Sequence, residues 1–272
     1  MFKFRNPHVS DILYESVPSL LKEQIGNCFT HKLGPKGMKF QKFTAGIVPD
    51  SSIASSGPVA AWTYSRLGKS NFIILGAAHK PIKTQFVMMQ EGFWKTPLGE
   101  LVIDVKMANR IADLSDLINY DAVPHETEHS VEVQMPFLQY MFGNDFKFVP
   151  ILIYNQFADD NFLNTCNAVG GAIADAIKSS KDKWSIIATS DLTSRKKFDN
   201  KIIGHILKLR GEEMFSVLKE TETKICGFGG IATAIAAAKN LNAKNSKLLK
   251  YAKASEISPT EAQAGYASII IY

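Results

Sequence analysis

The sequence predicts an α/β fold with a mostly parallel central sheet and helices on both faces. Short apolar runs alternate along the chain with longer segments whose apolar residues recur every three or four positions. Strands that alternate with helices in this way are typical of parallel sheets with helical crossovers. The chain has 272 residues, of which 46% are hydrophobic, and no linker or repeat divides it. We therefore expect a single domain over residues 1–272.

Six runs are predicted to be strands. Five are apolar along most of their length, as expected of buried strands, and the sixth carries lysines. They are Thr44–Val48, Phe72–Leu75, Phe148–Ile153, Ser185–Ala188, Ser268–Ile271 and the more polar Lys247–Ala252.

Six further segments are predicted to be helices. Pro58 favours a helix start because proline is common in the first helical turn. The Ala-rich segment before Lys239 has no charge and should be buried on most sides. The predicted helices are Pro58–Leu67, Met107–Leu114, Val131–Phe142, Asn161–Lys178, Lys201–Leu218 and Gly229–Leu241.

The composition argues against several classes of protein. The N-terminus lacks the apolar core of a signal peptide, and no apolar run is long enough to span a membrane. The three cysteines, Cys28, Cys166 and Cys226, do not form a disulfide pattern, so we expect reduced thiols and a cytoplasmic protein. The net charge of +5 comes from scattered lysines without interleaved aromatic residues, which favours solvated surfaces over a nucleic-acid site.

Titratable residues follow three of the predicted strands. Asp50 and Asp191 come just after two of them, and His79 after a third. The carboxyl ends of parallel strands meet at one edge of the sheet, where α/β proteins bind their ligands. An Asp at a strand end can also be a helix cap or turn residue. Because three such residues meet at one edge, we expect a site there, with Asp50 and His79 ending adjacent strands.

Two more segments carry candidate site residues. Glu128 and His129 precede the predicted helix that begins at Val131, and Glu132 lies in its first turn, where they could cap the helix or orient a metal ligand. Cys226 directly precedes a Gly-rich helix start, whose free N–H groups would lower the pKa of its thiol. The alternative for Cys226 is a buried, inert cysteine.

The sequence His125-Glu126-Thr127-Glu128-His129 matches the zinc-peptidase pattern H-E-x-x-H. That chemistry needs both histidines on one face of a helix, with Glu126 as the general base. Pro124 precedes the motif and the surrounding residues are typical of a loop. We therefore interpret the match as a coincidence, and a zinc hydrolase is the least favoured function.

Five further segments form a recognisable pattern along the chain: FIILGAAH at 72–79, EHSVEVQMPFL at 128–138, SDL at 190–192, ICG at 225–227 and Gly265-Tyr266. Together they resemble the Memo family, in its order and spacing along nearly the whole chain, and residues 5–21 resemble its N-terminal segment. The resemblance implies the fold of class III extradiol dioxygenases, with a metal site at the strand ends.

The resemblance also implies roles for particular residues. The metal ligands would be Asp50, His79 and Cys226, although the family usually has a histidine where this chain has Asp50. Glu128, His129 and Asp191 match the family's surrounding residues and are the candidate catalytic groups. The family's base histidine corresponds to Ser194. Loss of a general base typically costs about 10²- to 10⁴-fold in rate, so ordinary catechol cleavage is disfavoured.

Three functions follow from this pattern. The first is an altered dioxygenase-like pocket, holding Fe(II), Zn(II) or no metal, with a binding role or an undefined redox role toward a protein or small molecule. The second is an active non-haem iron dioxygenase or related oxidoreductase. The third is the zinc hydrolase. No nucleic-acid or membrane partner is expected.

Overall fold

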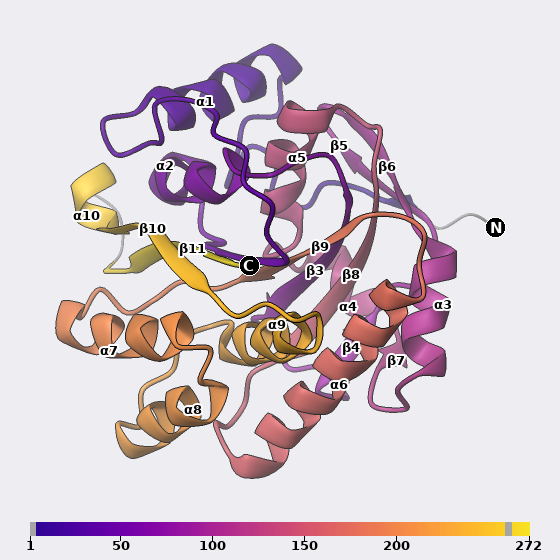
Figure 1. Cartoon of the computed structure of the whole chain (residues 1–272). Coiled ribbons are helices and arrows are strands. Elements are labelled where there is room, and N and C mark those ends of the chain that lie inside the picture. Colours follow the sequence, from indigo (N-terminus) through magenta and orange to yellow (C-terminus); the bar gives the residue numbers. More distant parts are fainter. Residues whose placement is uncertain (1–3, 259–262) are drawn as a thin grey trace.

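The computed structural model describes residues 4–258 and 263–272, which fold around one eleven-stranded sheet (Figure 1). The main path of the sheet runs β1-β5-β6-β8-β3-β9-β2-β11-β10, and β4 and β7 lie off it. Strands β6, β8, β3, β9 and β2 are parallel, whereas β11 and β10 continue the sheet in antiparallel fashion. The predicted α/β fold class is therefore confirmed.

All six predicted strands are present. They are β2 (Ala45–Val48), β3 (Asn71–Ala78), β8 (Lys147–Tyr154), β9 (Trp184–Thr189), β10 (Ser246–Lys253) and β11 (Gly265–Ile271). The sequence did not reveal five shorter strands, which carry too few alternating residues to be recognised. These are β1 (Phe4–Arg5), β4 (Phe86–Met88), β5 (Phe93–Thr96), β6 (Gly99–Ile103) and β7 (Asn119–Tyr120).

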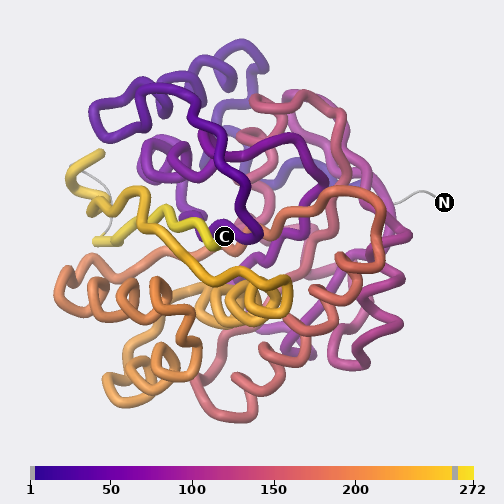
Figure 2. Tube along the Cα trace, viewed as in Figure 1, coloured from indigo at the N-terminus to yellow at the C-terminus, as the bar shows by residue number. Residues whose placement is uncertain are grey.

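Helices cover both faces of the sheet. Alternate residues of β3 enter different cores: Phe72 packs with α1, α2 and α5, whereas Ile73 packs with α3 and with α6 to α9. Figures 1 and 2 show the indigo and purple helices α1 and α2 on one side and the orange helices α7 and α8 on the other. The first group is α1 (Pro18–Thr30), α2 (Ile53–Tyr64) and α5 (Met135–Phe142). The second is α3 (Val105–Asp113), α6 (Asp160–Lys178), α7 (Lys196–Leu207), α8 (Gly211–Glu220) and α9 (Phe228–Asn240). In the described part of the chain, no helix is both long and apolar enough to cross a membrane.

Some predicted helix boundaries were wrong. The predicted helix Lys201–Leu218 is two helices, α7 and α8, because the buried Leu209 turns the chain with a φ of +54°. Helix α2 begins at Ile53, with Ser52 as its cap, so Pro58 lies inside the helix. Three helices were not predicted: α1 (Pro18–Thr30) and the short helices α4 (Val123–Thr127) and α10 (Ala254–Ile257).

Gly227 lets the start of α9 approach the end of β9. A Cβ atom added to Gly227 would lie 1.8 Å from the carbonyl oxygen of Thr189 and 2.8 Å from Cβ of Ser190. No other residue type fits without moving backbone, and this contact brings Cys226 to the end of β9. The glycine therefore fixes where Cys226 lies relative to the sheet.

We expect Gly227→Ala to lower the free energy of unfolding by about 1–3 kcal/mol, because the added methyl group overpacks this contact. Gly204→Ala is the matched control. Gly204 lies inside α7 with open space where its Cβ would be, so alanine there should stabilise the protein by about 0.5–1 kcal/mol. Urea denaturation measures both changes, and equal effects of the two substitutions would contradict this account.

A candidate metal centre at the strand ends

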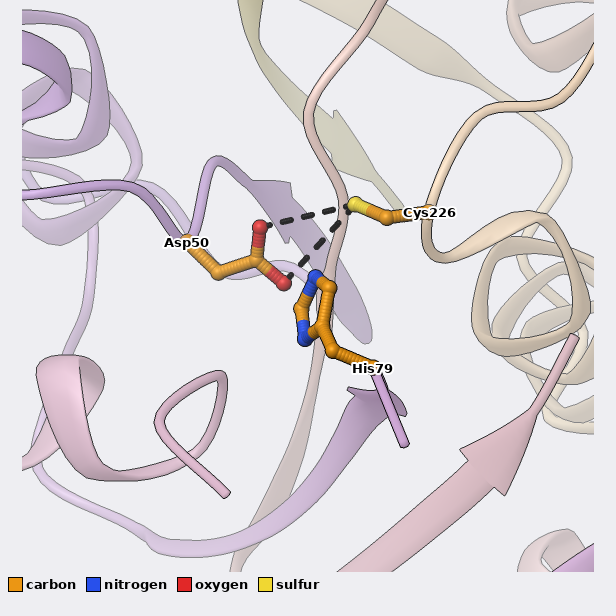
Figure 3. Close-up of side chains that lie close together, drawn as sticks. All are labelled: Asp50, His79 and Cys226. Atoms are coloured by element: carbon orange, nitrogen blue, oxygen red, sulfur yellow. Dashed lines mark hydrogen bonds between the residues drawn. The ribbon is translucent and has the colours of Figure 1, made fainter. Parts of the chain in front are cut away.

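Asp50, His79 and Cys226 meet at one point above the carboxyl ends of the strands. Asp50 follows β2 by two residues, His79 directly follows β3, and Cys226 precedes α9. One ligand atom from each residue lies within 4.8 Å of the others (Figure 3). The expectation that β2 and β3 are adjacent was wrong, because β9 runs between them and pairs with both. The three side chains therefore reach across the end of β9.

The carboxylate of Asp50 is buried and is held by a hydrogen bond from a residue of β9. Its Oδ2 accepts a hydrogen bond of 2.8 Å from the hydroxyl of Thr189, and its Oδ1 lies 3.5 Å from Sγ of Cys226. These contacts aim the carboxylate toward the sulfur and the imidazole, as Figure 3 shows.

His79 is oriented by Glu128. The Nδ1 atom of His79 lies 3.0 Å from Oε1 of Glu128, and the His79 backbone N–H donates to Oε2 over 2.8 Å. The backbone N–H groups of His129 and Ser130 also donate to Oε1, which fixes the Glu128 carboxylate. Because Nδ1 is occupied, Nε2 is the ring nitrogen left to face Asp50 and Cys226. Metal-binding histidines commonly carry such a carboxylate on the second ring nitrogen.

The charges of the site depend on one another. Burial alone would lower the pKa of His79, but the hydrogen bond to Glu128 and the charges of Asp50, Glu128 and Asp191 raise it to about 9. Burial would raise the pKa of Glu128, but its bonds to His79 lower it to about 2. Without a metal ion, an imidazolium therefore faces several carboxylates, and a bound cation would take the place of its proton.

The pKa of Cys226 moves in the direction opposite to the one the sequence suggested. Burial, and then the charges of Asp50 and Asp191, raise the pKa of the thiol, although its sulfur accepts a 3.1 Å hydrogen bond from the Asp191 N–H. The expectation from the helix N-terminus was wrong because it took no account of the burial of the thiol or of these two carboxylates. A divalent cation next to the sulfur would favour the thiolate again.

Asp191 and His129 border the same centre. Asp191 accepts hydrogen bonds from the Ser51 hydroxyl and from the backbone N–H of Asp50. Burial and the neighbouring Asp50 raise the pKa of Asp191. The ring of His129 stacks on His79 with 4.4 Å between centroids. His79, Glu128 and His129 form a second group with the spacing of metal ligands, an alternative to the first.

The H-E-x-x-H motif does not form a zinc-peptidase site. Helix α4 ends at Thr127 and Glu128 is extended, so His125 and His129 do not share a helix face. The ring of His125 is fully buried near Trp94, and burial, with the nearby Arg5, lowers its pKa to about 3. His125 is therefore a neutral core residue.

Ser194 adopts a left-handed conformation, with a φ of +68°, in the loop after β9. Its backbone nitrogen lies next to Gly265. Among the described hydrogen bonds, none joins Ser194 to Asp50, His79 or Cys226, and no imidazole occupies its position.

The sequence did not reveal the buried ion pair that holds the N-terminal segment, residues 4–16. Arg5 and Glu132 form a 2.5 Å ion pair with side chains only 1% exposed. Arg5 also donates to the carbonyl oxygens of His125 and Glu128, over 2.7 and 2.9 Å. Glu132 also accepts from the Tyr14 hydroxyl and from two backbone N–H groups near the N-terminus. Glu132, which the sequence predicts to cap the helix or orient a metal ligand, therefore binds the N-terminal segment instead.

The fold places the chain among α/β proteins with a mostly parallel sheet, a class that binds its ligands at the carboxyl edge of the sheet, where the candidate site lies. The chain belongs to the Memo family: the family model for Memo-like protein matches residues 5–270. It is 38% identical to a MEMO1 family protein of Pyrobaculum aerophilum, over 99% of each chain. It is 35% identical to one of Methanococcoides burtonii, over 98% of this chain and 99% of that one.

One solved structure supports the fold alone. An uncharacterized protein of Escherichia coli K12 superposes with a TM-score of 0.51 at 11% sequence identity. The match covers 84% of this chain and 100% of that one.

Arg5→Met should lower the free energy of unfolding by about 3–5 kcal/mol, because it leaves Glu132 buried without its counter-charge. The matched control is Lys69→Met. Lys69 pairs with Asp145 at the surface, and losing an exposed pair costs about 1 kcal/mol or less. Chemical denaturation compares the two variants, and a cost for Arg5→Met as small as that of Lys69→Met would contradict the role of the buried pair.

Proposed function

We propose that this Memo-family protein binds one Fe(II) or Zn(II) ion through Asp50, His79 and Cys226, and that it serves ligand binding or redox chemistry rather than catechol ring cleavage. The observation that carries the proposal is the convergence of a carboxylate, an imidazole and a thiol within 4.8 Å. Imidazole and thiolate suit both metals, and the carboxylate adds a hard oxygen donor.

The surrounding residues fit a cation. Glu128 occupies the ring nitrogen of His79 that the ion would not use. The Asp191 N–H donates to the sulfur of Cys226, which would help to hold a thiolate. The side chain of His79 is 36% exposed, so an external ligand can reach the centre. A bound ion would supply a Lewis acid or, as iron, a one-electron centre.

The absence of a base at Ser194 argues against ring cleavage, because general-base catalysis typically contributes about 10²- to 10⁴-fold. The second candidate, an active iron-dependent dioxygenase or oxidoreductase, is favoured by one observation. His129 stacks on His79 and could take a proton in place of the missing histidine. Oxygen uptake with catechols on iron-loaded protein separates the two functions: uptake at the rate of an active dioxygenase would favour the second.

The first test is metal binding by variants. After anaerobic reconstitution, we expect measurable iron or zinc in the wild type, at most one ion per chain and with iron below full occupancy, measured by elemental analysis. His79→Ala and Cys226→Ala should each lower the affinity at least about tenfold, because each removes one ligand of three. Cobalt substitution should give a thiolate charge-transfer band that Cys226→Ser abolishes.

His129→Ala separates the two possible ligand groups. It should leave metal content near the wild-type value, because His129 is outside the proposed set. Loss of metal in His129→Ala, with metal retained in Cys226→Ala, would assign the ion to His79, Glu128 and His129 instead.

Replacing Asp50 with the family's usual histidine gives the second test. Asp50→His, alone or with Ser194→His, should raise iron occupancy above the wild-type level, because imidazole is the softer donor and suits iron better than a carboxylate. Ser194→His alone is the control and should leave occupancy unchanged, since Ser194 makes no described hydrogen bond to the three ligands. Equal occupancy in wild type and Asp50→His would show that Asp50 does not limit iron binding.

A further inference from the structure

Strand β9 supplies none of the three proposed ligands, although it lies between the two strands that lead to Asp50 and His79. It pairs with β2 as far as its last residue, Thr189, and with β3 as far as Ala188. Thr189 therefore ends its strand at the same edge of the sheet, between the two ligand positions. A side chain there can act on the proposed centre without binding the ion itself.

The hydroxyl of Thr189 is buried and is used both as a donor and as an acceptor. It donates to Oδ2 of Asp50 over 2.8 Å, and it accepts from the backbone N–H of Ala77 over 3.4 Å. Ala77 lies on β3, two residues before His79. One hydroxyl therefore contacts the carboxylate of one proposed ligand and the strand that leads to another.

Thr189 makes the shortest described hydrogen bond to the Asp50 carboxylate. The other described contacts to its two oxygens come from Sγ of Cys226 and are longer, at 3.5 and 4.0 Å. Those contacts need the proton of the thiol, which a bound ion would displace. The Thr189 hydroxyl would then continue to hold the carboxylate, and a ligand already held in one orientation loses less conformational freedom on binding.

The packing of β9 does not require a hydroxyl at this position. The three residues before Thr189 are the buried Ile186, Ile187 and Ala188. Valine has nearly the shape of threonine and is common in buried parallel strands. The hydroxyl therefore contributes through its polar contacts rather than through the core.

We propose that Thr189 is a positioning residue of the candidate metal centre, whose hydroxyl holds the Asp50 carboxylate in the orientation that binds the ion. The inference rests on the proposed function and deepens it, because it names a residue outside the ligand set that controls metal affinity. Removal of a group that hydrogen-bonds to a metal ligand typically costs about 10- to 100-fold in metal affinity.

The test measures zinc and cobalt(II) affinities of anaerobically purified variants by competition with a chelator. Thr189→Val removes the hydroxyl and should weaken both affinities about tenfold or more. It should also shift the d–d bands of bound cobalt, while the thiolate band from Cys226 persists. Thr189→Ser keeps the hydroxyl and should bind both ions nearly as tightly as the wild type.

The matched control is Thr63→Val, which makes the same chemical change at another buried threonine. The Thr63 hydroxyl shares a hydrogen bond with the hydroxyl of Ser268 and makes no described contact with the three proposed ligands. Thr63→Val should leave both metal affinities at the wild-type value. An equal loss of affinity in Thr63→Val and Thr189→Val, or wild-type affinity in Thr189→Val, would overturn the inference.

A double-mutant cycle tests whether Thr189 acts through Asp50. In the Asp50→Ala background there is no carboxylate for the hydroxyl to hold, so adding Thr189→Val should change zinc affinity by less than about twofold. A loss as large as that in the wild-type background would show that Thr189 acts by another route and would overturn the inference.

The zinc-loaded wild type gives a test that needs no variant to fold. Its crystal structure should show the Thr189 hydroxyl still bonded to the Asp50 carboxylate, and a carboxylate turned away from Thr189 would overturn the inference. A wild type that takes up no metal would overturn the proposed function and the inference with it. If His79→Ala weakens zinc binding and Thr189→Val does not, the inference alone fails.

Discussion

The site depends on one electrostatic constraint, the crowding of Asp50, Asp191 and Glu128 at the carboxyl edge of the sheet. Carboxylates at such short range need a cation or protons to coexist. In the metal-free chain His79 meets part of that need, and its pKa rises to about 9 as a result. Burial, and then Asp50 and Asp191, raise the pKa of the Cys226 thiol. A bound cation would stabilise these crowded carboxylates, and this is the physical argument for the metal site proposed above.

A second constraint ties the N-terminal segment to this edge. Arg5 is fully buried, pairs with Glu132 and lies over the ring of Trp94 at 4.3 Å from its centroid. The same guanidinium donates to the carbonyl oxygen of Glu128, the residue that orients His79. Two successive contacts thus connect Arg5 with the candidate metal ligand His79. The N-terminal segment is therefore part of the site's support.

The sequence predicted the central sheet well, and also which residues lie at the carboxyl ends of its strands, because both depend on local patterns. Buried strands such as β3 and β8 are continuous apolar runs, and the residue that follows a strand needs no tertiary information to be placed at an edge. The break at Leu209 was missed because an apolar residue at that position continues the helical spacing, and only its positive φ shows the turn. The thiol's pKa was missed because Asp50 and Asp191 reach Cys226 from distant parts of the chain.

The resemblance implies that Asp50 stands where the family usually has a histidine, and that difference would change the net charge of the proposed centre. With a divalent ion in place, Asp50 and Cys226 as anions and His79 as a neutral imidazole would sum to zero. A centre with a second histidine in place of Asp50 would carry one positive charge. Catechols bind to dioxygenase-type iron as anions, and a neutral centre beside Asp191 attracts anions less. The altered ligand and the lack of a base at Ser194 would thus act in the same direction, against the cleavage of anionic catechols.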